Sequence, residues 1–217
     1  MMRRAWLGLV LGFVAASVSA WAYPRLPDAI DPPWARSSEP MSALAVALIT
    51  PLVILGVWAF LQVVPRIDPR GVEVYDRFRP TYNLIANAIF LFMTASHVAV
   101  VFGALGIFER PDGFLIAGAG VLIAIVGNNA GRVEPNWFFG LRTPWTLSSD
   151  VVWRKTHRAA GQLAVLVGSG LAAFGIWLPL HPGVALGGSA AVIGGLSMVL
   201  SYVFWLKEGS PSRAESP

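Results

Sequence analysis

Three residues near the middle of the chain carry the side chains of a hydrolytic triad. Ser148 could act as the nucleophile, His157 as the general base and Asp150 as the carboxylate that orients the imidazole. A nucleophilic serine also needs a sharp strand-to-helix turn and an oxyanion hole, and the sequence around Ser148 predicts neither. The chain has three histidines, no cysteine and no His-Glu-x-x-His pattern, so a zinc site is equally unsupported. We therefore predict a protein that is not an enzyme and that uses no metal and no cofactor.

Four polar residues in an otherwise apolar segment form a second candidate site. At about 100° per residue, they fall within an arc of about 80° on one helix face. Polar side chains are costly against lipid, so this stripe should face the interior of a helical bundle. It could form a ligand or proton path in which the histidine titrates, or it could supply interhelical hydrogen bonds that fix the fold. The members of this intramembrane polar stripe are Asn83, Asn87, Thr94 and His97.

The most varied segment is the connection between two apolar segments, residues 129–158. About thirty residues is far more than two neighbouring helices need for their connection. Aromatic and basic residues are typical of a segment in the lipid headgroup layer, but interface anchoring does not need asparagine, glycine, proline and aspartate so close together. We therefore predict that this segment, with the residue before it, forms a docking or coupling surface. Its expected residues are Asn128, Asn136, Gly140, Arg142, Thr143, Pro144, Trp145, Asp150, Trp153, Arg154, Thr156, His157 and Arg158.

The end of this connection should already be helical. Ser149 is a suitable N-cap, and the carboxylate of Asp150 in the first turn suits the helix dipole. On the helix that follows, Trp153, Arg154 and His157 share one face with Asp150. Asp150 can pair with Arg154 at i, i+4.

The composition indicates that these candidate sites lie in a membrane protein. The chain of 217 residues is 55% hydrophobic and only 13% charged, and soluble domains carry nearly twice that charged fraction. The mean hydropathy is +0.62. Since a span needs about 20 apolar residues, we predict an all-α polytopic bundle with six transmembrane helices, the fourth being short. The six apolar segments are Ala5–Ala22, Met41–Val64, Leu84–Phe108, Phe114–Gly127, Ala159–Leu180 and Gly183–Leu206.

The basic residues predict the orientation of this bundle. With both termini in the cytoplasm, thirteen lysines and arginines lie inside and three outside, which is a large bias under the positive-inside rule. The long connection 129–158 is then cytoplasmic. The three outer residues are Arg25, Arg36 and Arg110, and the inner ones are Arg3, Arg4, Arg66, Arg70, Arg77, Arg79, Arg132, Arg142, Arg154, Lys155, Arg158, Lys207 and Arg213.

The first apolar segment has an alternative interpretation. Arg3 and Arg4, the apolar run and the small residues up to Ala20 together resemble a cleavable secretory signal. Cleavage would leave five spans and a mature chain that begins at Trp21 outside the cell. The other loops would keep their sides.

Small residues should bring the helices together, because lipid competes equally for apolar surface. Three sets have four-residue spacing, and the tight connections around Pro111 and Pro182 predict that the helices they join are antiparallel neighbours. The sets are Gly127 and Gly131; Ala164, Gly168 and Ala172; and Gly187, Ala191 and Gly195.

An ordered set of motifs runs through the long connection: Gly127-Asn128, Pro135-Asn136, Phe139–Leu147, Val152-Trp153, Thr156–Arg158 and Gly161. This order resembles the signature of the SdpI family, bacterial membrane proteins named after an immunity protein against a secreted peptide toxin. The resemblance is specific over Gly127–Gly161, and the hydropathy is compatible from Asn83 to Leu206. In many family members an N-terminal region supplies the outer loop, which commonly carries a histidine-tryptophan pair. Here residues 23–34 are only weakly similar to that loop, and the histidine is missing.

The resemblance implies three parts and a function. Residues 1–80 form a two-span region with an outer loop, 81–207 a four-helix domain that contains the loop 129–158, and 208–217 a polar tail. The founding member protects its cell from a toxin, senses it and draws a DNA-binding repressor to the membrane. The resemblance therefore implies an immunity and sensor protein of the bacterial cytoplasmic membrane. Its implied partners are the lipid bilayer, an extracellular peptide toxin and a cytoplasmic repressor, with no direct nucleic acid binding.

The alternative function is a small transporter or membrane enzyme that uses the polar stripe. No acidic or basic residue lies well inside a predicted span. The sequence therefore offers no charged residue near the middle of a span for coupling transport to an ion.

Overall fold

The structure is a computed structural model, and it describes residues 6–33, 40–177 and 180–208. The basic residues 3, 4, 36 and 213, Trp34 and the polar tail 209–217, on which parts of the predictions rest, lie outside the described residues. The helices are α1 (Trp6–Ala22), η1 (Tyr23–Arg25), α2 (Ala43–Ile67), α3 (Val72–Arg77), α4 (Arg79–Ala104), α5 (Pro111–Ala130), α6 (Pro144–Ser148), α7 (Asp150–Phe174) and α8 (Pro182–Glu208). A short antiparallel hairpin pairs β1 (Ala29–Ile30) with β2 (Met41–Ser42). The prediction of an all-α protein is confirmed.

Within the described residues, five helices are long and apolar enough to cross a membrane. They are α1 with η1, α2, α4, α5 and α8. Helix α7 has 25 residues, but Arg154, Lys155, His157 and Arg158 lie in its first three turns. Its apolar part, residues 159–174, is shorter than the roughly 20 residues that a span needs. Length and composition thus support five of the six predicted spans, and the sixth, in α7, remains a prediction.

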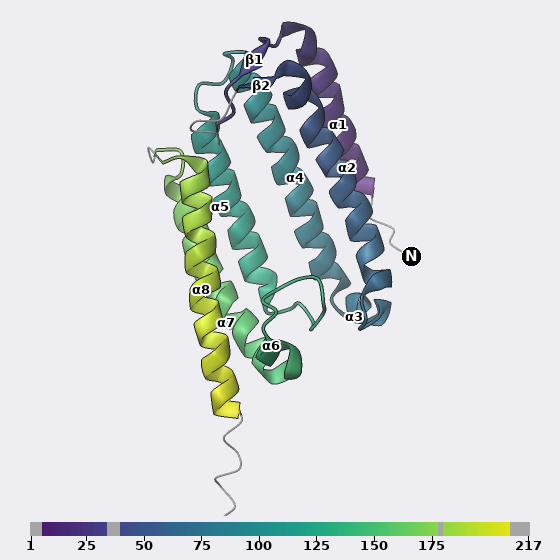
Figure 1. The fold of residues 1–217 in the computed structure, drawn as a ribbon, viewed down its shortest axis with the longest axis vertical. Helices are drawn as coiled ribbons and strands as arrows, with labels where there is room; N and C mark the ends of the chain where they lie inside the picture. The colour runs from purple at the N-terminus through teal and green to yellow at the C-terminus, as the bar shows by residue number, and fades with distance from the viewer. Residues whose placement is uncertain (1–5, 34–39, 178–179, 209–217) are drawn as a thin grey trace, which may run out of the picture.

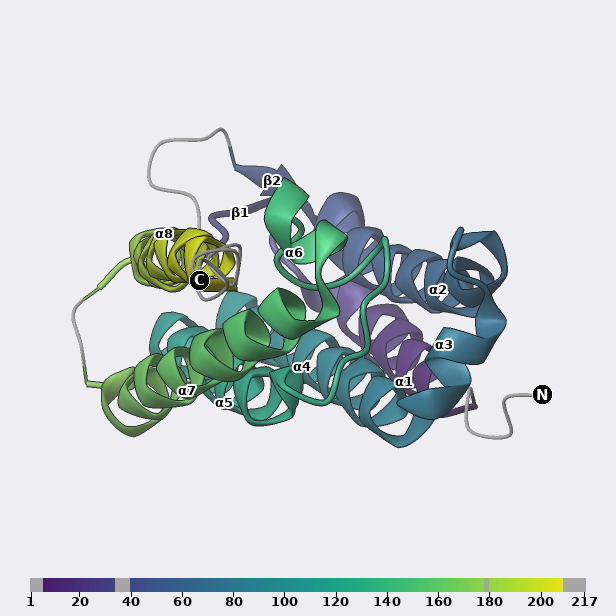
Figure 2. The same ribbon diagram turned by 90° about the horizontal axis from the view of Figure 1, so that it is seen from below.

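The long helices lie side by side along the long axis of the molecule, and the other elements gather at its two ends (Figure 1). The β1–β2 hairpin lies at one end, and α3, α6 and the segment between α5 and α6 lie at the other. Seen from that second end, α1, α2 and α3 lie on one side and α8 on the opposite side, with α4, α5 and α7 between them (Figure 2).

The described basic residues are concentrated at the α3 and α6 end. Ten lysines and arginines lie in or next to the helix ends and connections there, against Arg25 and Arg110 at the hairpin end. The unequal distribution of basic residues that the sequence predicts is therefore also present between the two ends of the structure. The placement of the two ends relative to a membrane remains a prediction.

Two apolar clusters join the helices from α1 to α5. One contains Ile54, Leu61 and Val64 of α2 with Tyr75 and Tyr82, near the α3 end. The other surrounds the hairpin and includes Ile30 with residues of α2, α4 and α5. The aromatic rings of Tyr75, Phe78, Tyr82 and Phe139 pack edge to face or tilted, with centroids 5.4 to 6.4 Å apart. Phe139 belongs to the α5–α6 connection, so this cluster ties that connection to α3 and α4.

Helices α5 and α7 meet backbone to backbone. A Cβ atom at Gly120 would lie 2.4 Å from the amide nitrogen of Ala172, and one at Gly127 would lie 2.7 Å from the Cβ of Ala164. A Cβ at Gly168 would lie 2.6 Å from the amide nitrogen of Ala124. The packing role predicted for the small residues of these two helices is confirmed.

Helix α8 packs differently from the prediction. It contacts α7 and α5, and its buried residues are Pro182, Ala185 and the serines 189, 197 and 201. A Cβ atom at Gly187 or Gly195 would meet nothing within 4 Å. The prediction that the 187, 191, 195 set packs against another helix of this chain is therefore wrong, because α8 turns its serine face inward instead.

Candidate functional site

The segment between α5 and α7, residues 131–149, includes α6 and folds at the α3 end of the molecule. We call it the signature segment. The amide of Asn136 organises its first turn. The side chain is fully buried; its Oδ1 accepts hydrogen bonds from the backbone nitrogens of Phe138 at 2.9 Å and Phe139 at 2.7 Å. Its Nδ2 donates to the carbonyl of Glu134 at 2.9 Å. Such side-chain bonds replace the backbone partners that a turn lacks.

Two threonines hold the second turn, at α6. Thr143 is extended and caps α6: its hydroxyl accepts from the amide of Thr146 at 3.2 Å, and its own amide donates to the hydroxyl of Thr146 at 2.8 Å. Pro144 occupies the first helical position, where the missing amide hydrogen costs nothing. Both threonines are buried. Thr143 and Pro144 thus fix the backbone of the segment.

His157 connects α7 to the signature segment. Its Nδ1 lies 2.9 Å from the carbonyl of Trp153, and its Nε2 accepts from the amide of Leu141 at 3.0 Å. A carbonyl can only accept and an amide can only donate, so the imidazole is neutral with its proton on Nδ1. Burial lowers the pKa of His157, although the bond to the Trp153 carbonyl acts in the opposite direction. The ring stacks on Trp153 with centroids 4.0 Å apart.

Gly140 is the residue that this arrangement requires. Its φ is +100°, and a Cβ there would lie 2.3 Å from Nε2 of His157. Only glycine meets both conditions.

No hydrolytic triad is assembled. Both ring nitrogens of His157 are bound to backbone groups, the hydroxyl of Ser148 donates to the carbonyl of Trp145, and Asp150 pairs with Arg70. Among the described residues, no group of three His, Asp or Glu side chains could hold a metal ion.

Asp68 connects the signature segment to the N-terminal helices, and sequence reasoning missed it. It follows α2 directly and its side chain is buried. Its carboxylate accepts from the hydroxyl of Tyr75 at 2.6 Å, from the amide of Trp137 at 3.0 Å and from the amide of Arg70 at 2.8 Å. Burial, and then the bond to Asp68, raise the pKa of Tyr75 well above its usual range. An acidic residue directly after an apolar helix was the signal that could have identified it.

Arg70 forms a second connection on the outside of the same turn. Its guanidinium lies 3.4 Å from the carboxylate of Asp150 and donates to the carbonyl of Leu147 at 3.3 Å. The ion pair of Asp150 is therefore with Arg70 in the α2–α3 turn, rather than with Arg154 on its own helix. Both side chains are partly exposed, so the pair contributes little by itself.

Helix α8 closes the other side of the site. The indole nitrogen of Trp145 donates to the hydroxyl of Ser201 at 2.6 Å, and the ring packs edge to face on Tyr202. The hydroxyl of Ser149, which caps α7 as predicted, donates to the carboxylate of Glu208 at 2.6 Å. The signature segment thus contacts elements from both halves of the chain.

The predicted docking residues fall into two groups. Asn136, Thr143, Trp153, Thr156 and His157 are buried, and Trp145 is partly buried. The indole of Trp153 is fully buried and donates to the carbonyl of Val133 at 2.8 Å. Only the second group is available to a partner: Asn128, Gly140, Arg142, Pro144, Asp150, Arg154 and Arg158 are exposed.

The polar stripe on α4 also divides. Thr94 and His97 are buried; the hydroxyl of Thr94 donates to the carbonyl of Leu11, and Nε2 of His97 lies 2.8 Å from the hydroxyl of Ser19. These two residues therefore link α4 to α1, which favours the fold-fixing interpretation for this half of the stripe. Asn83 and Asn87 are only partly buried and form no side-chain hydrogen bond within the described residues.

These features indicate a helical membrane protein, in which five described helices are long and apolar enough to cross a membrane and a folded connecting segment joins the two halves of the chain. Residues 132–206 match the SdpI/YfhL protein family, and this confirms the family resemblance that the sequence predicts. The chain is also 23% identical over 170 residues to the immunity protein SdpI of Bacillus subtilis (strain 168), covering 77% of this chain and 79% of that protein. No solved structure matches the chain significantly. The family match begins in the signature segment and ends near the end of α8.

Proposed function

We propose that this chain is an integral membrane immunity protein that protects a bacterial cell from a secreted antimicrobial peptide toxin. The observation that carries the proposal is the similarity to the immunity protein SdpI over more than three quarters of both chains, signature segment included. In this proposal the chain lies in the cytoplasmic membrane with six spans and both termini inside. The toxin is met on the side of the β1–β2 hairpin.

The contacts of the signature segment support a second role, as the cytoplasmic coupling surface of the protein. Asp68 and Arg70 join the segment to the end of α2, whose other end begins directly after β2. A toxin that binds one packing of α1 and α2 better than another would shift the population of the two packings, because ligands act through differential affinity. The exposed side chains of Arg142, Asp150 and Arg154 would then be presented differently to a cytoplasmic repressor.

The proposal assigns no catalytic group to the chain. The alternative, transport or catalysis along the polar stripe, receives no specific support from the contacts of Thr94 and His97.

Survival of a toxin-sensitive host tests the proposed function. Cells that express the full chain should survive a toxin dose that kills cells with an empty vector. The Arg142→Ala variant should still fold, because Arg142 is exposed and its side chain bonds only to the carbonyl of Trp137 among the described residues. It should lose most of this protection, because it removes a charged side chain of the proposed coupling surface. Lys155→Ala is the matched control, since Lys155 is an exposed basic residue at the same end of the molecule, and it should protect as well as the unchanged chain.

Two results would contradict the proposal. If the full chain is present in the membrane and the cells die like the vector control, the chain is not an immunity protein against that toxin class. If both variants protect fully, the signature segment is not the effector surface.

A further inference from the structure

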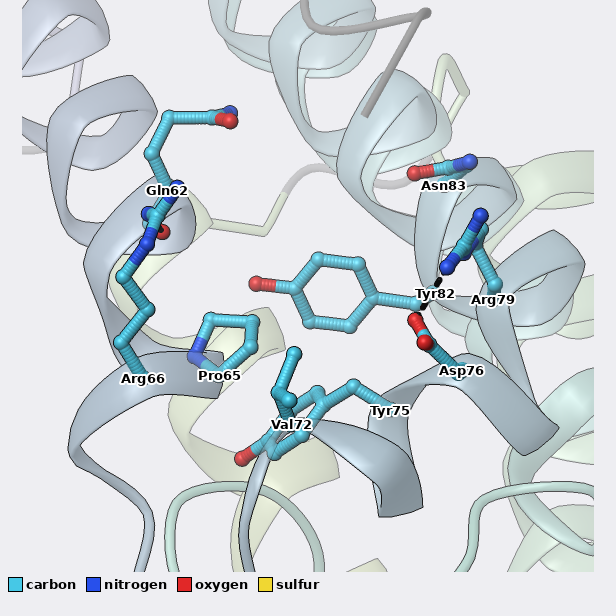
Figure 3. A pocket seen from close by; sticks show the side chains of 9 residues that line it. All are labelled: Gln62, Pro65, Arg66, Val72, Tyr75, Asp76, Arg79, Tyr82 and Asn83. Atoms are coloured by element: carbon cyan, nitrogen blue, oxygen red, sulfur yellow. Dashed lines mark hydrogen bonds and ion pairs between the residues drawn. The ribbon is translucent and has the colours of Figure 1, made fainter. Parts of the chain in front are cut away.

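A polar pocket of about 340 Å³ lies where α2 ends and α4 begins, with α3 below it (Figure 3). Its wall from α2 carries Gln62 and Arg66, and its wall from α4 carries Arg79 and Asn83. The ring of Tyr82 lies between the two walls. The two arginines therefore approach one cavity from two different helices.

The polar groups in this pocket are only partly used by the protein. Arg66 donates to the carbonyl of Gln62, and Arg79 pairs with the carboxylate of Asp76, which is also part of the lining. Within the described part of the chain, the side-chain amides of Gln62 and Asn83 form no hydrogen bond. Two guanidinium groups and two amides thus offer donors to a ligand.

The charge of the pocket indicates what the ligand is. Two guanidinium groups and one carboxylate give the lining a net charge of +1. Guanidinium groups bind phosphate oxygens in charge-assisted pairs, and one phosphodiester carries a single negative charge. The net charge of the lining therefore matches one phosphodiester.

The surroundings indicate a lipid. Helices α2 and α4 are both long and apolar enough to span a membrane, and the pocket lies at their ends. Near the pocket, α2 exposes Val63 and Ile67, and α4 exposes Leu84. Val72, which lines the pocket, is half exposed. Exposed apolar side chains beside a basic pocket at the end of membrane helices are typical of a headgroup site with acyl chains alongside.

We propose that this pocket binds the phosphodiester headgroup of an anionic glycerophospholipid. Arg66 and Arg79 hold the phosphodiester from opposite sides, and the amides of Gln62 and Asn83 bond to headgroup or glycerol oxygens. The acyl chains lie along the exposed apolar side chains of α2 and α4. The site accounts for Asn83, which the sequence singles out and whose side chain forms no hydrogen bond within the described residues.

Asp76 provides a test with an effect in the opposite direction. Its carboxylate competes with the lipid phosphate for Arg79, and both side chains of that pair are about half exposed, at 43% and 51%. Replacing it by asparagine removes the competitor and raises the positive charge of the lining. Asp76→Asn should therefore bind the anionic lipid more tightly, whereas loss of the arginines should weaken binding.

The experiment is native mass spectrometry of the purified full chain in a neutral detergent. Dioleoylphosphatidylglycerol, dioleoylphosphatidylcholine and inorganic phosphate are titrated in separate series. The unchanged chain should retain one phosphatidylglycerol at concentrations where it retains little phosphatidylcholine and no phosphate. The variant with Arg66→Gln and Arg79→Gln together should bind phosphatidylglycerol at least roughly tenfold more weakly, since two charge-assisted bonds are lost. Arg77→Gln is the matched control, because Arg77 is an exposed arginine of α3 outside the pocket, and it should bind like the unchanged chain.

Three results would overturn the proposal. Equal retention of phosphatidylglycerol by the double variant and the Arg77→Gln control would mean that the two arginines only extend towards headgroups at the surface. Equal retention of phosphatidylcholine would mean that the site does not select an anionic lipid, and displacement of the lipid by inorganic phosphate would make the ligand a soluble phosphate. If the double variant does not fold, the Asp76→Asn variant still decides, because unchanged or weaker binding of phosphatidylglycerol contradicts the proposal.

Discussion

At the scale of single residues, His157 has its two ring nitrogens in opposite roles, because one faces a carbonyl and the other an amide. The imidazole fills the space that Gly140 leaves open and stacks on the indole of Trp153. Three residues that look like parts of a reactive or docking surface in the sequence thus form the internal support of the signature segment. The exposed residues around them remain free to meet a partner.

The neutral state of His157 predicts a pH dependence of stability. Below about 6.5, the ordinary pKa of histidine, the unfolded chain takes up a proton at this position that the folded chain resists, since burial lowers the pKa in the fold. The free energy of unfolding should therefore fall as the pH drops below 6.5, and this contribution should be constant above it. In the His157→Gln variant the fall should be smaller, and stability at neutral pH should be lower by about 1–3 kcal/mol. Denaturant unfolding of the full chain in detergent at several pH values measures both, and an unchanged pH profile in the variant would refute the assignment.

Gly140 gives a second prediction at this scale. Gly140→Ala should destabilise the chain by about 2 kcal/mol or more, because it places a Cβ at positive φ and 2.3 Å from a ring nitrogen. Gly56→Ala is the control: Gly56 lies inside α2, and a Cβ there meets nothing within 4 Å. That change should be neutral or stabilise by up to about 1 kcal/mol. Equal midpoints of thermal unfolding for the two variants would contradict the geometry at Gly140.

At the scale of elements, α5 and α7 are the two described helices whose backbones pack most closely. Gly120 and Gly127 of α5 leave room for the backbone of α7, and Gly168 does the same in return. This contact positions the start of α7, and with it His157, under the signature segment. On the opposite side, the turn after α2 reaches the segment through Asp68 and Arg70.

The α5–α7 contact predicts that added volume there will not be tolerated. Gly120→Ala should cost about 2 kcal/mol or more, because its Cβ would lie 2.4 Å from a backbone nitrogen that cannot move away cheaply. Gly187→Ala on α8 is the control, and it should change stability by less than about 1 kcal/mol in either direction. Unfolding of the purified variants by sodium dodecyl sulfate in mixed micelles compares the two. A larger loss in Gly187→Ala would show that α8, and not α5, carries the critical small-residue contact.

The Asp68 contact predicts a local change at a distance in sequence. Asp68→Ala removes the acceptor of the Trp137 amide, so hydrogen exchange in the segment 131–149 should become faster. Asp31→Ala, an exposed aspartate near the hairpin, should leave that exchange unchanged. Exchange mass spectrometry of the two variants makes the comparison. Unchanged protection in Asp68→Ala would mean that the N-terminal half does not hold the signature segment.

At the scale of the whole molecule, the sequence predicts the helices well, because the lengths of the apolar segments and the positions of the prolines indicate where helices run and begin. Ser149 as a helix cap and the small residues between α5 and α7 are likewise local signals that the fold keeps. The partners of the polar groups are not local. Asp150 pairs with Arg70, which is 80 residues away in the sequence, and Asp68 binds the amide of Trp137, which is 69 residues away, so no spacing within one helix predicts either contact. The stretch 159–174 of α7 has 16 residues, among them Gln162 and Ser169, and it is too short for length alone to decide whether α7 spans a membrane.

The proposed function requires the hairpin and the signature segment to lie on opposite sides of the membrane, since an external toxin and a cytoplasmic partner both depend on this placement. The chain has no cysteine, so single cysteines can report the sides directly. Asp31→Cys and Arg110→Cys mark the hairpin end, and Arg142→Cys and Lys155→Cys mark the signature end. In intact cells, from which the outer membrane has been removed if there is one, a membrane-impermeant maleimide should label only the first two, and all four should react after the cytoplasmic membrane is permeabilised. Labelling of Arg142→Cys or Lys155→Cys in those intact cells, or protection of both hairpin cysteines, would show that the two ends do not lie on the proposed sides of the membrane.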